Sequence, residues 1–367
     1  MSKRRKFKKM LYFVLIIILV ALIPLAWLLW IAAGQVPNDQ RLERCERSPQ
    51  WHDGQFVNTH PTPHLTGDKP MPVVMWNFLF GQIENLKPDS DLPLVKTPLR
   101  HLARDKEVCL WLGHSTVFIQ TGGVRYLFDP VLTSKLPVTL FMRPFKGTDG
   151  YTPDDIPEVD YLIITHDHWD HLDWRTVTAI RDRVKHVVCP LGVGQHFEYW
   201  DYDTQLISEL DWNDSIAVND SATLRCLPSR HFSGRLFGRN LTLWASYLID
   251  GPRRIYVSGD GGYDDRFKNI GTQYPGIDLA VMENGQYNLD WKYIHTLPGQ
   301  LPQAIDDLNP KRVLTYHNSK YALARHAWTE PLDSILVNAR NHPWKLLTPR
   351  IGETIDLDRD QTFSKWW

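Results

Sequence analysis

The sequence predicts an α+β domain preceded by an N-terminal transmembrane helix. The chain of 367 residues is 43% hydrophobic, which is enough to build one large core. From residue 159 onward, short β-branched runs alternate with segments of helical periodicity. Several of these runs end in His or Asp, so we expect polar side chains to gather at one edge of a sheet.

An apolar segment near the N-terminus is expected to anchor the chain in a membrane. Residues 10–34 carry no charge, and about 20 apolar residues can span the ~30 Å hydrocarbon core of a bilayer. The basic tail, residues 1–9, should stay in the cytoplasm by the positive-inside rule, so we expect the rest of the chain to be exported, to a periplasmic or other extracytoplasmic space. A signal peptide cleaved near Ala32-Ala33-Gly34 is the alternative. The apolar run exceeds the ~7–15 residues of a signal core, which favours an uncleaved single-pass anchor.

Residues 35–106 are expected to form a linker and strap segment. They are rich in Pro, His and Asp and show no long periodic segment. One apolar and aromatic stretch, Met71–Phe80, stands out within them. We expect it to pack as a lid or strap on the main domain. The alternative is a surface that faces a membrane or acyl chains.

The catalytic domain is assigned to residues 107–367, and its later elements can be placed in order. The first is a buried strand at 159–165, because its apolar residues are continuous and rich in β-branched side chains. Turn residues mark two hairpins, with Asn219-Asp220 and Asp250-Gly251 at their turns. The full set is strands at 159–165, 185–189 and 205–209, hairpins at 215–227 and 241–257, and helices at 175–183, 192–200, 264–272, 301–308 and 331–341.

The segment after the strand at 159–165 has the spacing of a two-metal site. His166 and His168 can project from one short turn towards one ion, and Asp170 with His171 can turn towards a second ion beside it. A surface loop that happens to be rich in His and Asp is the alternative. Further candidate ligands downstream weigh against that alternative.

Three later residues complete the candidate ligand set. His231, Asp260 and His317 each follow a strand-like run. Taken singly, a His after a strand is usually a hydrogen-bonded structural residue. Found together in this order, they are better explained as a third ligand for one ion, a bridging carboxylate and a last ligand for the other ion.

These motifs together resemble the metallo-β-lactamase superfamily. Within it, the chain is most similar to the N-acylphosphatidylethanolamine-hydrolysing phospholipase D branch, over about residues 109–342, although L-ascorbate-6-phosphate lactonase relatives share much of the pattern. The shared segments are 109–120, the Gly122-Gly123 turn, 126–131, the ligand loop with Leu172-Asp173, 258–263 and Tyr316-His317. The resemblance implies an αββα sandwich. One departure is Asp260-Gly261-Gly262, where the family usually has Asp-Thr-Gly.

The resemblance also implies roles for individual residues. Zinc is preferred over iron or manganese because imidazole and carboxylate ligands suit a borderline ion. Two zinc ions ~3.5–4 Å apart could share a hydroxide that attacks phosphorus. Asp170 and His295 are the candidate catalytic residues, the latter for substrate contact or leaving-group protonation. The implied set is His166, His168 and His231 on one ion, Asp170, His171 and His317 on the other, Asp260 across both, and Asp129 and His114 orienting ligands from behind.

A loop-like insertion at 135–146 is a candidate substrate entrance. It mixes apolar residues with cations, which suits a phospholipid because acyl chains need a greasy wall and phosphate needs positive charge. The possible substrate contacts are Phe141, Arg143, Phe145 and Lys146.

Composition limits the remaining classes of function. The net charge of −1 argues against a nucleic-acid-binding protein, which normally carries a basic surplus. The four cysteines show no C-x-x-C pairing and are expected to be small buried hydrophobic residues. The predicted function is a membrane-anchored zinc phosphodiesterase acting on a phospholipid. A lactonase or other ester hydrolase, and a non-catalytic envelope binding protein, are the alternatives.

Overall fold

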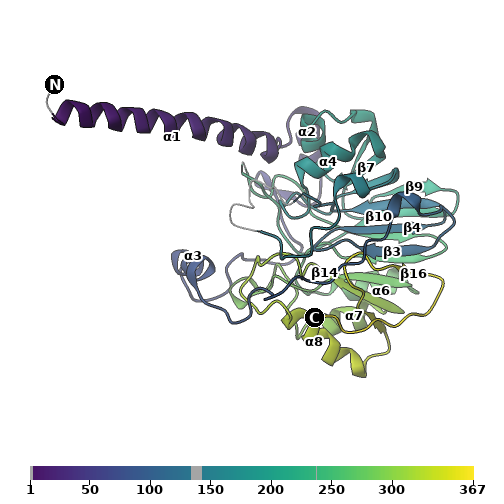
Figure 1. Cartoon of the computed structure of the whole chain (residues 1–367). Coiled ribbons are helices and arrows are strands. Elements are labelled where there is room, and N and C mark those ends of the chain that lie inside the picture. The colour runs from purple at the N-terminus through teal and green to yellow at the C-terminus, as the bar shows by residue number, and fades with distance from the viewer. Residues whose placement is uncertain (1–2, 134–142, 237) are drawn as a thin grey trace.

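The computed structural model describes residues 3–133, 143–236 and 238–367, and its body is built on two facing sheets (Figure 1). Each sheet has seven strands. The first runs in the order β16 (Ile355–Asp356), β3 (Val108–Trp111), β4 (Val117–Thr121), β5 (Val124–Phe128), β6 (Val159–Ile163), β7 (Val184–Pro190) and β8 (Ile207–Leu210). The second runs in the order β15 (Lys345–Leu347), β14 (Arg312–Tyr316), β13 (Leu279–Glu283), β12 (Arg254–Val257), β11 (Ser246–Asp250), β10 (Ala222–Leu227) and β9 (Ser215–Asn219).

The two sheets share one pattern of strand directions. In the first, β16, β3, β4 and β5 pair antiparallel, and β5 to β8 pair parallel. In the second, β9 to β12 pair antiparallel, and β12 to β15 pair parallel. Parallel neighbours need crossover helices, and these helices must lie on the outer faces.

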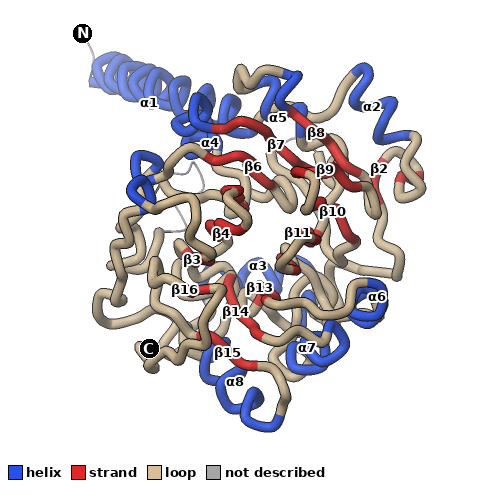
Figure 2. The backbone as a smooth tube through the Cα atoms, turned by 90° about the vertical axis from the view of Figure 1, so that its right-hand side faces the viewer, coloured by secondary structure: helices blue, strands red, loops and turns tan. Residues whose placement is uncertain are grey.

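The main core fills the space between the sheets. Its large side chains include Trp111, Phe128, Trp244, Tyr247 and Tyr316, all buried. A second core lies under α4 (Trp174–Ile180) and α5 (Gly194–Tyr199), and a third under α6 (Arg266–Gln273), α7 (Leu301–Leu308) and α8 (Glu330–Asn338) (Figure 2). The predicted αββα sandwich is therefore confirmed.

Most predicted elements lie within a few residues of the observed ones. Two boundaries differ, and short-range bonding explains both. The strand expected at 205–209 begins later, because Asp203 caps a 3-10 turn at Thr204–Leu206. The hairpin expected from 241 begins at Ser246, because the preceding backbone bonds to the other sheet's loops, with Leu243 donating to Leu191 and Ala245 to Thr165.

The strap segment packs on the body through its first half. It contains α2 (Asp39–Glu46) and the small pair β1 (Trp51–His52) and β2 (Gln55–Phe56). Cys45 and Phe56 are fully buried in the main core. Arg41 pairs with the buried Glu209 at 2.7 Å, which fixes α2 against the edge strand β8.

The apolar stretch expected to pack as a strap is instead an exposed helix. α3 (Met71–Phe80) begins after Pro70 and carries a Pro in its first turn, where a missing N–H costs nothing. Val74 is buried, but Trp76 is 65% exposed and Phe80 is 61% exposed. The prediction of a packed strap is therefore wrong for this stretch. Its side chains have too few neighbours on the body to bury them.

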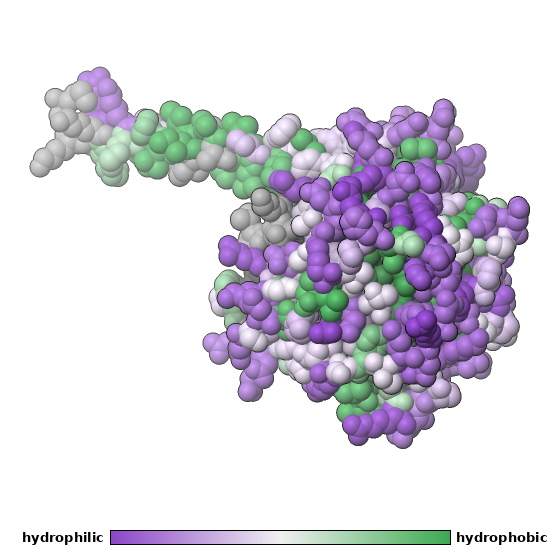
Figure 3. Space-filling model, turned by 45° about the vertical axis from the view of Figure 1, so that its right-hand side comes forward, coloured by the Kyte–Doolittle hydropathy of each residue, from purple (hydrophilic) through white to green (hydrophobic). Residues whose placement is uncertain are grey.

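The N-terminal segment forms one long helix, α1 (Lys3–Ala33), that projects from the body (Figure 1). In the space-filling view its apolar residues stand clear of a largely hydrophilic surface (Figure 3). No helix in the described part of the chain combines the length and the apolar character that a membrane span requires.

Candidate metal centre

The candidate ligands meet at one edge of the sandwich, where strands from both sheets end. His166, His168, Asp170 and His171 follow β6. His231, Asp260 and His317 follow β10, β12 and β14 of the other sheet. The structure brings all seven into overlapping groups whose ligand atoms lie within 4.8 Å of one another.

The first group consists of three imidazoles. His168 Nδ1 lies 2.9 Å from His166 Nε2 and 3.2 Å from His231 Nε2. Nitrogen ligands of zinc lie at about 2.0–2.1 Å from the ion, so tetrahedral neighbours are about 3.3 Å apart. The observed spacing therefore fits three corners of one zinc ligand shell.

The second group combines two imidazoles and a carboxylate. His317 Nε2 lies 3.1 Å from His171 Nε2 and 3.3 Å from Asp170 Oδ2. All three residues come from loops that face each other across the gap between the sheets. Their donor atoms have the spacing of a second ligand shell beside the first.

Asp260 lies between the two groups. Its Oδ2 is 3.2 Å from both His171 Nε2 and His317 Nε2, and 3.8 Å and 4.0 Å from the nitrogens of His231 and His166. Its Oδ1 is buried and has no hydrogen-bond partner among the described residues. A buried carboxylate oxygen without a donor is costly unless a cation faces it, which is what a bridging ligand would supply.

Groups behind the ligands fix their ring orientations. His171 Nδ1 lies 2.8 Å from Asp129 Oδ2, and His231 Nδ1 lies 2.7 Å from the carbonyl of Ile294. A proton on Nδ1 in each ring leaves Nε2 free to bind metal. Thr165 holds Asp129 in turn, through its backbone N–H at 2.7 Å and its hydroxyl at 2.6 Å. The role of Thr165 escaped sequence analysis because a Thr at a strand end carries no metal-site signal.

His114 lies beside the second group rather than behind it. Its Nε2 is 2.8 Å from Asp170 Oδ2, and burial followed by the nearby His317 lowers its pKa to about 3. A neutral ring there can hold Asp170 or join the ligand set. His114, Asp129 and His317 all have left-handed backbone, with φ of 50°, 42° and 67°. Such strain costs about 1–3 kcal/mol per residue and is typical of functional sites.

Burial and charge put His166, His231 and Asp260 in the protonation states that metal binding needs. For His171, burial is outweighed by Asp260 and Asp129, which raise its pKa well above the ordinary value, so a cation would have to displace its proton. Burial, reinforced by neighbouring histidines, holds the pKa of His166 well below its ordinary value, and burial does the same for His231. Burial opposes ionisation of Asp260, but His171 and His317 outweigh it and hold that pKa well below its usual range. Neutral imidazoles and ionised carboxylates are the forms that bind cations.

His295 lies at the margin of the site and is held by Glu283. Its Nδ1 makes a short ion pair with Glu283 Oε1 and lies 3.9 Å from Asp260 Oδ2. Burial lowers the pKa of His295, but Glu283 and Asp260 outweigh it, so that the pKa is raised. Glu283 is buried and also accepts from the backbone N–H of Gly261 at 3.0 Å. Sequence analysis missed Glu283 because a single Glu at a strand end carries no metal-site signal.

A partly buried arginine ties the ligand loop to the end of α1. Arg235 donates to the carbonyls of Asp167 and Leu172, which flank the ligands, at 2.7 and 2.9 Å. It also donates to the carbonyls of Ala32 and Ala33 at 2.6 and 3.0 Å. The carboxylate of Asp167 accepts from Gly234 N–H at 2.8 Å. Neither Asp167 nor Arg235 was predicted as part of the site.

The predicted substrate contacts fall into three groups. Phe141 lies outside the described residues. Arg143 and Lys146 are exposed, as a contact requires. Phe145 is only 5% exposed, and its backbone N–H donates to Lys320, so its side chain belongs to the body and not to an open entrance. For Phe145 the expected greasy wall is therefore not observed.

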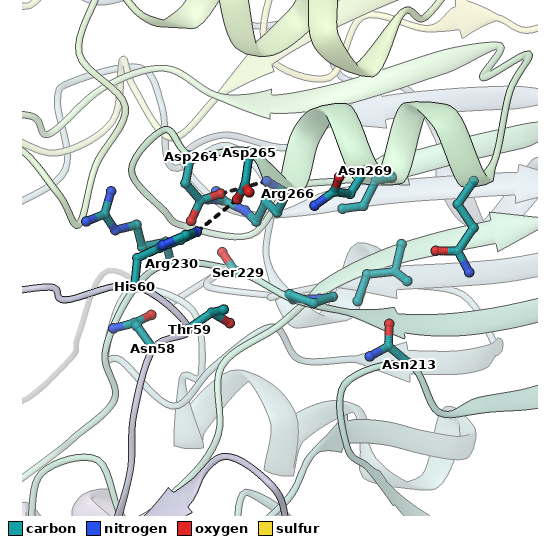
Figure 4. Close-up of a pocket in the computed structure, with 14 residues that line it drawn as sticks. Asn58, Thr59, His60, Asn213, Ser229, Arg230, Asp264, Asp265, Arg266 and Asn269 are labelled. Atoms are coloured by element: carbon teal, nitrogen blue, oxygen red, sulfur yellow. Dashed lines mark hydrogen bonds and ion pairs between the residues drawn. The ribbon is translucent and has the colours of Figure 1, made fainter.

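A polar cavity of about 240 Å³ lies beside the metal centre (Figure 4). It lies between α6 and the chain around Asn58, and none of the candidate ligands lines it. Asn58 nevertheless accepts from His231 N–H at 3.1 Å and donates to His231 C=O at 2.7 Å. Ser229 donates to the carbonyl of Asp260 at 2.6 Å. The cavity therefore borders the backbone of two candidate ligands, and none of the candidate ligand side chains lines it.

Comparison with known proteins decides the family. A sequence model of the beta-lactamase superfamily domain matches residues 124–318. The chain belongs to the metallo-β-lactamase superfamily. A relative in this superfamily, an uncharacterized protein of Mycobacterium tuberculosis, is 34% identical over 330 residues, which is 88% of each chain.

One further relative bears on the chemistry of this superfamily member, and one solved structure bears on its fold. N-acyl-phosphatidylethanolamine-hydrolyzing phospholipase D 1 of Caenorhabditis elegans is 28% identical over 285 residues, 70% of this chain and 79% of that one. The crystal structure of CmlA, a diiron β-hydroxylase from Streptomyces venezuelae, has a TM-score of 0.55 at 20% identity, over 68% of this chain and 54% of that one. The first relationship supports a metal-dependent hydrolase. The second shows a shared fold.

The structure explains the departure from the superfamily pattern at Gly261. A Cβ at this position would lie 2.6 Å from Ser229 Oγ and 2.8 Å from Arg266 Nη2. Arg266 is buried, so a threonine at this position would require the side chains of Ser229 and Arg266 to move. The hydroxyl of Ser229 occupies this space and bonds to the Asp260 carbonyl. The metal-ligand carboxylate itself is unaffected by the substitution.

Proposed function

We propose that this protein is a membrane-anchored, two-zinc phosphodiesterase that hydrolyses a phospholipid. One observation carries the proposal: Asp260 lies between two ligand groups, with one carboxylate oxygen shared and the other buried without a donor. Two zinc ions bound there would supply a nucleophilic water at neutral pH and would neutralise charge on the phosphoryl oxygens. The ligands would be His166, His168, Asp170, His171, His231, Asp260 and His317.

The surrounding residues would orient the ligands, and His295 would donate a proton to the leaving group. Asp129 and the Ile294 carbonyl hold His171 and His231 in the tautomer that faces the ions. The ion pair with Glu283 favours a protonated His295 at the margin of the site. A protonated imidazole there can donate to the oxygen of the leaving group, which is the role of a general acid.

Similarity to a phospholipase supports a lipid phosphodiester as the substrate class. The relative from C. elegans acts, by its name, on N-acyl-phosphatidylethanolamine. The exposed cations Arg143 and Lys146 could pair with a phosphate. The uncharged part of α1, residues 10–33, supports an anchor that would hold the domain beside its lipid substrate, outside the cytoplasm.

Zinc is preferred over iron for a chemical reason. The first ligand group holds three imidazoles and no carboxylate other than Asp260, a set that suits a borderline ion. The diiron relative of similar fold makes iron the competing metal. Metal analysis of protein purified without chelator would distinguish the two, and activity restored to stripped protein by zinc but not by ferrous iron would support zinc.

The direct test of the function compares three substrates on the same zinc-loaded protein. We expect turnover of a phospholipid and of a small chromogenic phosphodiester, with higher kcat/KM for the lipid. Higher efficiency on a lactone than on either phosphodiester would instead favour the ester hydrolase. No turnover of any of the three with two metals bound would favour a binding protein.

A further inference from the structure

We propose that α3 lies on the surface of the bilayer and turns the edge carrying the metal centre towards the membrane. This inference rests on the proposed membrane anchor, and it adds a second and separate lipid contact. It also assigns the source of the substrate: a phospholipid that enters the site from the bilayer surface, not from solution.

The composition of α3 is typical of a helix that is enclosed by protein or by lipid. Met71–Phe80 contains no charged residue. A helix that is apolar all round is normally enclosed by protein or by lipid. Here the protein does not enclose it, because Met71, Met75, Trp76 and Phe80 are all at least 50% exposed. Trp76 and Phe80 form a ring pair with centroids 4.5 Å apart, and Trp is enriched at the membrane interface.

The position of α3 selects a bilayer over other partners. α1 and α3 lie on the same side of the body in Figure 1, and both lie on the far side in Figure 2. A membrane that receives α1 therefore meets α3 on the same face of the protein. A second copy of the chain docked on α3 would have to share this side with the membrane.

Both helices are attached to loops that carry metal ligands. The end of α1 is bound by Arg235, which also holds the loop of His166 to His171. The end of α3 is bound by Arg325, which donates to the Phe78 carbonyl at 3.1 Å and follows the His317 loop. The metal centre therefore lies at the edge of the body to which both apolar helices attach.

Side chains between the helices and the metals suit a lipid. Leu236, next to Arg235, is 53% exposed. Arg239 is exposed, and its guanidinium lies 5.0 Å from the ring of Phe232. The Phe232 ring lies in turn 4.4 Å from the ring of His168. Arg239 could pair with the phosphate of a phospholipid, and Phe232 could contact its apolar part beside the candidate ligand His168.

The cysteines make a direct test possible, because all four are free and buried. An exposed cysteine introduced by substitution can therefore be labelled alone in the full chain. We would attach an environment-sensitive fluorophore in the variants Trp76→Cys on α3, Ile23→Cys on α1 and Val337→Cys on α8. The proteins would be reconstituted in phosphatidylethanolamine–phosphatidylglycerol vesicles, with and without a quencher carried on the lipid tails.

The expected result is a blue-shifted, quenched signal at positions 76 and 23, and an unquenched signal at position 337, which is 61% exposed on α8. Quenching at 23 without quenching at 76 would overturn the proposal and leave the anchor intact. Quenching at neither position would overturn both. A label at 76 that is shielded but not quenched, more so as protein concentration rises, would show a second copy on α3 and would also overturn the proposal.

A functional readout separates this proposal from the reaction itself. The double variant Trp76→Asp with Phe80→Asp should lower kcat/KM for vesicle phospholipid at least tenfold and leave turnover of a small soluble phosphodiester unchanged. The matched control is Val337→Asp, which should change neither. Equal losses on both substrates in the α3 variant would contradict a role confined to the membrane. The fluorescence result stands whether or not the protein proves to be a phosphodiesterase.

Discussion

At the scale of single residues, the spacing of donor atoms carries the argument for metals. Three imidazole nitrogens lie close together, with that of His168 2.9–3.2 Å from the other two. Without a metal this arrangement is unfavourable, because each neutral ring has only one N–H and the remaining ring nitrogens would face each other as unpaired acceptors. A cation at their centre removes the conflict. Asp260 extends the same reasoning to a second ion, because its oxygens have more lone pairs than the described residues can satisfy.

Replacing Asp260 tests the bridge. The wild-type protein should hold about two zinc ions per chain, and Asp260→Asn should hold one or fewer, because the amide keeps the shape and removes the shared charge. Metal analysis by mass spectrometry would measure both. The matched control is Asp265→Asn, whose carboxylate is exposed and pairs with His60 at 2.9 Å. Two ions retained in Asp260→Asn would refute the bridging role.

His64 should make stability depend on pH in the acid range. Burial, then the nearby Arg239, lowers its pKa to about 4 from an ordinary value near 6.5. Between these values the unfolded chain binds more protons than the folded one, so the free energy of unfolding falls as the pH drops from about 6.5 to about 4 and then levels off. We expect His64 to lower the free energy of unfolding by about 2 kcal/mol across this window. This is less than the full pKa difference implies, because the side chain keeps some solvent contact.

The measurement is denaturant unfolding of the wild type and His64→Gln from about pH 8 to about pH 4. The variant should lose less stability across the window and should match the slope of the wild type above pH 7. Parallel curves for the two proteins would mean that His64 titrates normally.

At the scale of elements, the sequence predicted the strands that end in candidate metal ligands. It did not predict the residues whose roles depend on contacts with distant parts of the chain. The strands before His166, Asp260 and His317 were evident because apolar runs end in metal ligands. Glu283 and Arg235 were not evident, because their roles come from contacts with residues far away in the sequence. The packing of Met71–Phe80 was mispredicted for a related reason. Its composition indicated burial, but composition does not say whether protein or lipid provides the cover.

Arg235 links two elements, so its removal should affect both. Arg235→Met leaves four carbonyls without their donor, from Ala32, Ala33, Asp167 and Leu172. We expect zinc affinity to fall about tenfold and the melting temperature to drop, since groups that hold a ligand loop tune metal binding. Competition with a chromogenic chelator would measure the affinity. Arg239→Met, in the same loop but exposed, should change neither quantity.

At the scale of the whole molecule, the proposed anchor α1 predicts a direction for the chain across the membrane. Basic residues precede Leu11 and are scarce just after Gly34, so the catalytic domain should lie outside the cytoplasm. A reporter fused after Trp367 that matures only in an oxidising exported compartment should be active. A reporter that works only in the cytoplasm should be inactive at the same position, and activity of that second fusion would reverse the orientation.

Because the candidate ligands come from both sheets, metal binding would also hold the two sheets together. Each proposed ion would take His166 and His168, or Asp170 and His171, from the half built on β6, and His231 or His317 from the half built on β10 and β14. Free energy of metal binding would then also be free energy holding the two halves together. Stripping the metals should loosen the sandwich first along this seam, and amide hydrogen exchange should speed up in the ligand loops well before it does at the opposite ends of the strands. The same metal ions would then serve the reaction and stabilise the contact between the two halves of the sandwich.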